Sequence, residues 1–300
     1  MNLIKPKKLK IGDTIGIIAP SGEVDFNKIL QSVKYFEQKG FNVKLGSHIK
    51  CQANEYLAGS DEQRLEDLHN AFLDDEIDAI LCARGGYGAL RLIDKIDYSI
   101  IKNHSKIFCG YSDVTVLNSV FYKKCGLVTF SGPMAQGDFS AEIDTFTEKY
   151  FFETLQNGEF HITSKLSNEK FDPVEGTLFG GNLATLASLC GFDFIPDEKF
   201  ILFAEDVGEP VYKLDRYFTQ LFNIEQFSEN VCAIVCGDFS GIDSQNSLDI
   251  LLSEISNKYN IPVVKGFPFG HEKVKATIPC GAYTKLTNDG LFAENFLLDN

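Results

Sequence analysis

The sequence predicts an α/β protein built around a parallel sheet, and three observations lead to this fold class. Short apolar runs alternate with segments of helical periodicity over residues 14–130. These runs are nearly continuous rather than alternating, as expected of strands that are buried on both faces. The chain has 300 residues, 44% of them hydrophobic, which is enough for one large domain or two ordinary ones.

The first half predicts five strands separated by helices. One expected helix, residues 26–39, ends at Gly40, and another, residues 60–74, opens with the capping-box pattern Ser60-Asp-Glu-Gln63. Strands and helices that alternate in this way are typical of a parallel sheet covered by helices on both faces. The expected strands are residues 14–19, 41–45, 79–83, 106–109 and 127–130.

The second half predicts a smaller mixed α/β domain. Because residues 156–173 have no clear apolar period, we place a linker at 151–172, between a first domain, 1–150, and a second domain, 173–300. Several short strand-like pieces follow in the tail. The other elements expected there are strands at 200–204, 231–236 and 261–264 and helices at 211–222 and 248–255.

Charge and cysteine content narrow the classes of function. A net charge of −14 argues against binding to nucleic acid. No apolar run reaches the length of a membrane span and the N-terminus lacks the pattern of a secretory signal, so we expect a cytoplasmic protein. Eight cysteines, mostly in apolar runs and without a C-x-x-C motif, favour buried thiols over disulfides or a metal site. We expect neither a metal ion nor a cofactor.

The segment Lys106–Asn118 carries the main candidate for a nucleophile. Its apolar run stops at Gly110, Ser112 follows, and a helical pattern begins at Val114. This strand–turn–helix order is that of a nucleophile elbow, in which backbone N–H groups at the helix N-terminus stabilise developing negative charge. The last glycine of the G-x-S-x-G motif is missing, and the alternative is that Ser112 only caps the helix.

A serine nucleophile needs a base and a third group that orients this base. Among the five histidines, His271 lies in a loop framed by proline and glycine, where the backbone shape is tightly specified. A surface histidine beside Glu272 is the alternative. Glu205 stands where an apolar strand ends, with Asp206 and Glu209 as neighbours that suit the same orienting role.

Gly85 and Gly86 form a glycine turn after the third expected strand. Their N–H groups suit either an oxyanion or a phosphate, although Arg84-Gly-Gly-Tyr-Gly-Ala fits neither common nucleotide-binding motif. Arg84 itself is a candidate for binding the carboxylate of a substrate, but we expect a structural ion pair instead.

Seven segments, in order from residue 14 to about residue 285, together resemble the serine LD-carboxypeptidase family, also called muramoyltetrapeptide carboxypeptidases. The resemblance implies an N-terminal flavodoxin-like domain and a smaller C-terminal domain, with the active site between them, usually in a homodimer. The segments are Gly16–Ser21, Tyr56–Arg64, Ala83–Gly88, Gly110–Thr115, Gly176–Leu183, Glu205–Pro210 with Tyr212 and Asp215-Arg216, and Gly270-His271 with Pro279-Cys-Gly281.

The resemblance also implies a catalytic triad and a substrate. Ser112 matches the nucleophile, His271 the base and Glu205 the carboxylate, while the backbone N–H groups of Gly86 and Asp113 match the oxyanion donors. The implied reaction is hydrolysis of the amide between the L-centre of a diamino acid, such as meso-diaminopimelate, and the terminal D-alanine of murein tetrapeptides, in the recycling of cell-wall peptides.

Two other functions remain open at this point. The microcin-immunity branch of the family resembles the chain in its triad but hydrolyses a peptidyl-nucleotide. That branch tends to carry a longer loop with a tryptophan that stacks on the adenine, and this chain has no tryptophan. The second alternative is a non-enzymatic protein that binds a small ligand between the two domains.

Overall fold

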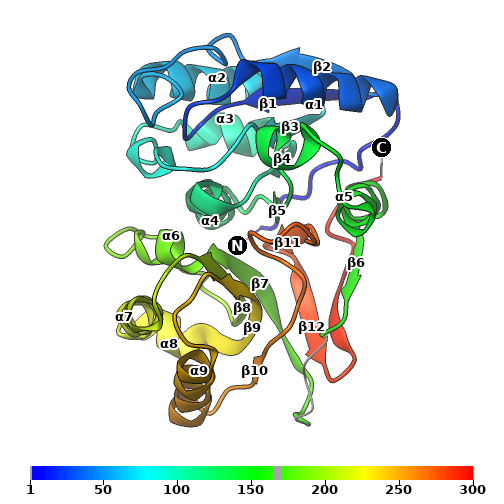
Figure 1. The fold of residues 1–300 in the computed structure, drawn as a ribbon. Coiled ribbons are helices and arrows are strands. Elements are labelled where there is room, and N and C mark those ends of the chain that lie inside the picture. Colours follow the sequence, from blue (N-terminus) through cyan, green and yellow to red (C-terminus); the bar gives the residue numbers. More distant parts are fainter. Residues whose placement is uncertain (1, 165–169, 300) are drawn as a thin grey trace.

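The computed structural model describes residues 2–164 and 170–299, which form two sheets stacked as an upper and a lower lobe in Figure 1. In this described part, the first sheet has the strand order β2-β1-β3-β4-β5-β11. Strands β1 to β5 run parallel in the flavodoxin-like order 2-1-3-4-5, which confirms the predicted fold class. The strands are β1 Thr14–Ile18, β2 Asn42–Leu45, β3 Ala79–Cys82, β4 Ile107–Cys109, β5 Thr129–Ser131 and β11 Ile278–Cys280.

Helices of the first lobe join the sheet through buried aromatic rings. Phe36 packs against Phe139, and Phe72 packs against both Phe108 and Phe121. Each of these fully buried rings contributes about 1.5–3 kcal/mol through the hydrophobic effect. The helices are α1 Phe26–Gln38, α2 Asp61–Leu73, α3 Tyr98–Asn103, α4 Thr115–Cys125 and α5 Thr145–Asn157, with short 3-10 or π segments η1 Ala89–Arg91, η2 Ser112–Val114 and η3 Ala135–Phe139.

The second sheet is mixed, with the order β10-β9-β8-β7-β12-β13-β6 in the described residues. Strands β7 to β10 run parallel, and β12, β13 and β6 run antiparallel to their neighbours. Its strands are β6 Glu159–Ile162, β7 Val174–Asn182, β8 Phe200–Val207, β9 Val231–Ser240, β10 Val263–Val264, β12 Tyr283–Thr287 and β13 Gly290–Glu294, and its helices are α6 Leu183–Ala187, α7 Val211–Phe222, α8 Glu225–Asn230 and α9 Gln245–Tyr259.

Local signals in the sequence are met in several places. The capping box at Ser60 and Gln63 is formed at the start of α2, as predicted.

Two strands belong to sheets that were not expected from their position in the sequence. Strand β6 lies in the expected linker and pairs with β13 in the second sheet, and β11 pairs antiparallel with β5 in the first sheet. Residues 165–169 of the expected linker lie outside the described residues. We keep the division into 1–150, 151–172 and 173–300 as a proposal.

The start of helix α4 lies against strand β7 of the other lobe, and Figure 1 shows α4 between the two sheets. The N–H of Asn182 donates a buried hydrogen bond to Thr115 Oγ1 over 3.1 Å. A Cβ at Gly181 would come within 2.5 Å of the same Thr115 oxygen, and Gly181 has a φ of 145°. The glycine pair of β7 therefore permits the close approach of the two lobes. In the part of the chain that the structure describes, no helix has both the length and the apolar character to span a bilayer.

We predict that Gly181→Ala lowers the free energy of unfolding by about 2 kcal/mol or more, because the new methyl group adds a steric clash to an unfavourable φ. Gly191→Ala is the matched control, since Gly191 also has a positive φ of 105° but has no atom within 4 Å of the place that an added methyl group would take. Urea denaturation of both variants gives the comparison. Equal losses of stability would contradict a tight contact between the lobes at Gly181.

Candidate active site

Ser112 stands at a sharp turn between strand β4 and helix α4. Its φ is 63°, in the left-handed region that residues other than glycine adopt at a cost of about 1–3 kcal/mol. The N-cap positions of η2 and α4 are Tyr111 and Val114, and no side chain caps either helix. The structure therefore contradicts the alternative in which Ser112 serves as a helix cap, and the strained turn is the feature expected of a nucleophile elbow.

The glycine turn after β3 lies directly against Ser112. A Cβ at Gly85 would be 2.8 Å from Ser112 Cβ and 3.4 Å from the backbone nitrogen of Asp113. The N–H of Gly22 donates to the Gly85 carbonyl over 3.0 Å and holds the turn from its other side. Within residues 2–164 and 170–299, the N–H groups of Gly86 and Asp113 donate no hydrogen bond. Asp113 directly follows the serine and Gly86 directly follows Gly85, which lies against it, so both N–H groups have the capacity to bind an anion.

Glu205 and His271 meet in the second lobe. Glu205 is buried at the carboxyl end of β8, with 3% of its surface exposed, and its Oε2 lies 2.7 Å from Nδ1 of His271. An ionised carboxylate can only accept, so Nδ1 is the donor of this contact and Nε2 is the ring nitrogen left for a second partner. A Cβ at Gly270 would be 3.2 Å from Glu205 Oε2, so the glycine before His271 lets the loop approach the carboxylate.

The histidine also contacts the first lobe. The ring of His271 packs edge-on against the ring of Tyr111, with centroids 5.1 Å apart, and Tyr111 directly precedes Ser112. The structure thus brings the loop of His271 to the residue next to the serine. Among the described residues, no hydrogen bond joins His271 to Ser112.

The two other carboxylates that suited the orienting role have different partners. Asp206 accepts hydrogen bonds from Asn182 Nδ2 and from the N–H of Ala184. Burial raises the pKa of Asp206, and the nearby charge of Glu205 adds to this effect. Glu209 forms an ion pair of 2.9 Å with Lys213.

The side chain of Asp113 supports the glycine turn from within the first lobe. Its Oδ2 accepts a hydrogen bond of 2.8 Å from the N–H of Ala89, which follows the turn. Burial raises the pKa of Asp113, while this hydrogen bond and the charge of Arg64 favour the ionised form. The carboxylate of Asp113 thus supports the segment after the glycine turn, while its N–H donates no hydrogen bond among the described residues.

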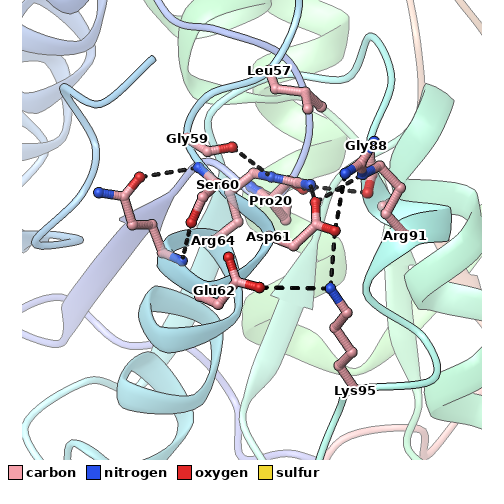
Figure 2. A network of polar contacts seen from close by, with 12 residues as sticks. Pro20, Leu57, Gly59, Ser60, Asp61, Glu62, Arg64, Gly88, Arg91 and Lys95 are labelled. Carbon is pink, nitrogen blue, oxygen red and sulfur yellow. Dashed lines mark hydrogen bonds and ion pairs between the residues drawn. The ribbon is translucent and has the colours of Figure 1, made fainter. Parts of the chain in front are cut away.

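Figure 2 shows a network centred on Arg64. Its side chain is 1% exposed, pairs with Asp61, and donates to the backbone carbonyls of Pro20, Gly59 and Gly88. Gly88 lies two residues after Gly86 of the glycine turn. Arg64 therefore joins the segment after that turn to the loops after β1 and before α2. No role was predicted for Arg64 from the sequence, although it closes one of the quoted segments directly after a capping box.

Arg84 has a different environment from the expected structural ion pair. Its Nη1 donates to the backbone carbonyl of Glu23 over 3.0 Å, and among the described residues it has no carboxylate within 4.0 Å. A Cβ built at Gly22 would be 3.4 Å from Arg84 Nε. The guanidinium therefore lies close to Gly22, the residue whose N–H donates to the Gly85 carbonyl of the glycine turn. The described residues contain no group of three His, Cys, Asp or Glu side chains that could hold a metal ion.

The structure thus has a serine on a strained strand-to-helix turn, and a histidine that pairs with a buried carboxylate and packs against the residue before this serine. Both features are found in serine hydrolases on α/β folds. Comparison with known proteins identifies the family more closely. Residues 15–132 match the LD-carboxypeptidase N-terminal domain and residues 175–286 match the LD-carboxypeptidase C-terminal domain. The chain belongs to the LD-carboxypeptidase family, as its sequence motifs indicated.

Individual relatives cover nearly the whole chain. A protein of Bacillus subtilis named "Probable murein peptide carboxypeptidase" is 38% identical over 93% of this chain and 90% of its own length. The crystal structure of muramoyltetrapeptide carboxypeptidase from Oxalobacter formigenes has a TM-score of 0.88 at 32% identity and covers 95% of this chain and 100% of its own. The microcin C7 self-immunity protein MccF has a TM-score of 0.87 at 26% identity and covers 98% of this chain and 100% of its own.

The Asp61 network gives a prediction on pH and stability. The hydrogen bonds from Arg91 above all, then the hydrogen bond from Lys95 and the charge of Arg64, lower the pKa of Asp61 to about 2 from its ordinary 3.8. A pKa that is lower in the folded state stabilises the protein above pH 3.8, and this stabilisation is lost as the pH falls toward 2. In an Asp61→Asn variant, the free energy of unfolding should therefore decrease less steeply as the pH is lowered over this range.

Urea denaturation between about pH 2 and pH 5 measures this dependence. Asp289→Asn, at an exposed turn between β12 and β13, is the control and should retain the slope of the unmodified protein. An Asp61→Asn variant with the same slope as this control would show that the network does not contribute to acid stability.

Proposed function

We propose that the chain is a serine LD-carboxypeptidase that hydrolyses the amide between the L-centre of meso-diaminopimelate, or a similar diamino acid, and the terminal D-alanine of murein tetrapeptides. The observation that carries this proposal is the 2.7 Å contact between His271 and the buried side chain of Glu205. The ring of His271 also packs against Tyr111, the residue before the strained Ser112. The names of the Bacillus subtilis and Oxalobacter formigenes relatives support the substrate class.

In the proposed mechanism, Nε2 of His271 takes the proton of Ser112 as the serine oxygen attacks the amide carbonyl. Glu205 holds the imidazole in the required tautomer and stabilises its charged form. His271 then gives the proton to the nitrogen of the departing D-alanine, and an acyl-enzyme remains on Ser112. A water molecule, activated by the same histidine, releases the tripeptide. Hydrogen bonds between a serine and its base commonly tighten when substrate binds, so the absence of a direct bond between Ser112 and His271 is compatible with this mechanism.

The tetrahedral intermediate carries negative charge on the former carbonyl oxygen. We assign the N–H groups of Gly86 and Asp113 as its donors, because Asp113 follows Ser112, Gly86 follows the residue that lies against Ser112, and neither N–H donates a hydrogen bond among the described residues. Each such donor stabilises the transition state by on the order of 3–4 kcal/mol.

A carboxypeptidase must also recognise the free carboxylate of the residue that it removes. We assign this role to Arg84, since its guanidinium lies at the glycine turn and has no carboxylate partner among the described residues. A guanidinium binds a carboxylate through two parallel hydrogen bonds, which gives both affinity and orientation. We further propose that the protein acts in the cytoplasm, as a homodimer, in the recycling of murein peptides.

Hydrolysis of a peptidyl-nucleotide is the second candidate function. The fold of the microcin C7 self-immunity protein MccF, which this chain matches over 98% of its length, favours it. The absence of tryptophan from this chain argues against it, because that branch is expected to carry a tryptophan that stacks on the adenine. A non-enzymatic ligand-binding protein ranks third, since it gives no reason for the pairing of Glu205 with His271.

We predict that the purified protein releases D-alanine from a murein tetrapeptide and that Ser112→Ala lowers this rate by about 10⁴-fold or more, because the nucleophile is lost. Quantification of free D-alanine measures the reaction. Ser188→Ala, at the end of α6, is the matched control and should retain the rate of the unmodified protein.

Incubation with a peptidyl-nucleotide separates the remaining candidates. Cleavage of the peptidyl-nucleotide without release of D-alanine from the tetrapeptide would favour the microcin-immunity function. Binding of the tetrapeptide without turnover of either compound would favour the non-enzymatic function. Either result would contradict the proposed carboxypeptidase.

The role of Arg84 has its own test. Arg84→Ala should raise KM for the tetrapeptide about 10- to 100-fold, because a hydrogen-bonded charge contact of roughly 1.5–3 kcal/mol is lost. A tetrapeptide that ends in D-alaninamide serves as the internal control, since its neutral end gives Arg84 no carboxylate to bind. If Arg84→Ala weakens the turnover of both compounds equally, the arginine has a structural role only.

A further inference from the structure

The loop that carries His271 is anchored to the first lobe at its C-terminal end. The N–H of Ala276 donates to the Pro268 carbonyl over 2.7 Å and closes the loop. Thr147 of α5, buried and 1% exposed, accepts from the N–H of Lys275 over 2.9 Å and donates to the Lys273 carbonyl over 3.0 Å. The loop therefore has a fixed base, from which the side chain of Lys275 extends into the first lobe.

Lys275 forms a buried ion pair between the lobes. Its Nζ lies 2.7 Å from Asp138 Oδ1, and the side chains are 4% and 9% exposed. Asp138 lies in η3 of the first lobe and also accepts a hydrogen bond from the N–H of Met134. Burial has the largest single effect and disfavours the charged ammonium, but the electrostatic attraction of Asp138 and Tyr111 and the hydrogen bonds with both together outweigh it, and the pKa of Lys275 is raised. Lys275 is therefore cationic at neutral pH.

The same ammonium group holds Tyr111. Nζ of Lys275 donates to the Tyr111 hydroxyl over 3.2 Å and lies 4.5 Å from the centroid of its ring. Burial, and then the charge of Asp138, raise the pKa of Tyr111, so the phenol stays neutral. The ring of Tyr111 in turn packs against His271 and precedes Ser112 in the chain. A continuous chain of contacts thus runs from Asp138 through Lys275 and Tyr111 to the imidazole.

We propose that Lys275 is a positioning residue of the active site, which holds Tyr111 and the loop of His271 so that the imidazole stands at the correct place beside Ser112. The inference rests on the proposed function in so far as it treats Ser112 and His271 as reacting groups. Its physical reason is that these two side chains belong to different lobes, and a misplacement of about 1 Å is enough to lower a rate about 10²-fold.

The test compares Lys275→Met with the double variant Lys275→Met/Asp138→Asn. The single variant leaves Asp138 as an unpaired buried charge and is expected to lose thermal stability. The double variant removes that charge and should regain stability, while Tyr111 and the loop stay unanchored. Lys123→Met is the matched control, because Lys123 is another lysine with an 8% exposed side chain that pairs with Asp197 of the second half, over 2.6 Å.

Two readouts are needed, kcat and KM for D-alanine release and the rate at which a fluorophosphonate labels Ser112. We expect both Lys275 variants to lower kcat and the labelling rate by about 10²-fold with little change in KM, and Lys123→Met to leave both rates near those of the unmodified protein. Recovery of both rates in the double variant would overturn the proposal, because stability alone would then explain the loss. An equal loss in Lys123→Met, or no loss in Lys275→Met, would also overturn it.

The labelling readout separates this inference from the choice of substrate. If the unmodified protein releases no D-alanine but Ser112 is labelled at a rate that depends on Lys275, the proposed substrate is wrong and the positioning role stands. If D-alanine is released and neither rate depends on Lys275, the proposed function stands and the positioning role is wrong.

Discussion

The close contact between the start of α4 and the glycine pair of β7 is the constraint on which the rest of the site depends. Gly181 leaves room for Thr115, whose oxygen accepts the N–H of Asn182 across the lobes. Thr115 lies three residues after Ser112, and Asn182 is paired in register with Glu205 on β8. This contact between the backbone of β7 and the side chain of Thr115 therefore fixes the distance between the strained serine and the strand that carries Glu205.

Around this contact, charged groups are buried only where they have partners. Glu205 is paired with His271, Asp206 with backbone and amide donors, and Lys275 with Asp138. A buried charge without a partner would destabilise the fold by several kcal/mol. The same pairings give the site its rigidity, since each partner belongs to a different element. The stability of the fold and the alignment of the proposed reacting groups thus depend on the same hydrogen bonds.

Much of this arrangement could be predicted from the sequence, because it follows from local patterns. Continuous apolar runs predicted the parallel strands, and Gly110 with Ser112 predicted the turn before α4. Local sequence could not choose between Glu205 and Asp206, since neighbouring residues on a strand point to opposite faces and the face that meets His271 is set by tertiary packing. It also gave no sign that β11 joins the first sheet or that Lys275 pairs with Asp138, because both depend on contacts between residues more than 130 positions apart.

In the proposed active site, one serine, one histidine and two backbone N–H groups from separate elements converge on a single reacting atom. A crystal structure of the protein after reaction with a fluorophosphonate tests this most directly, because the phosphonyl group imitates the tetrahedral intermediate. We expect a covalent bond to Ser112 Oγ, a phosphonyl oxygen within hydrogen-bond distance of the N–H groups of Gly86 and Asp113, and Nε2 of His271 within reach of Oγ. A phosphonyl group on another residue, or one on Ser112 whose oxygen points away from both N–H groups with His271 out of reach, would contradict it.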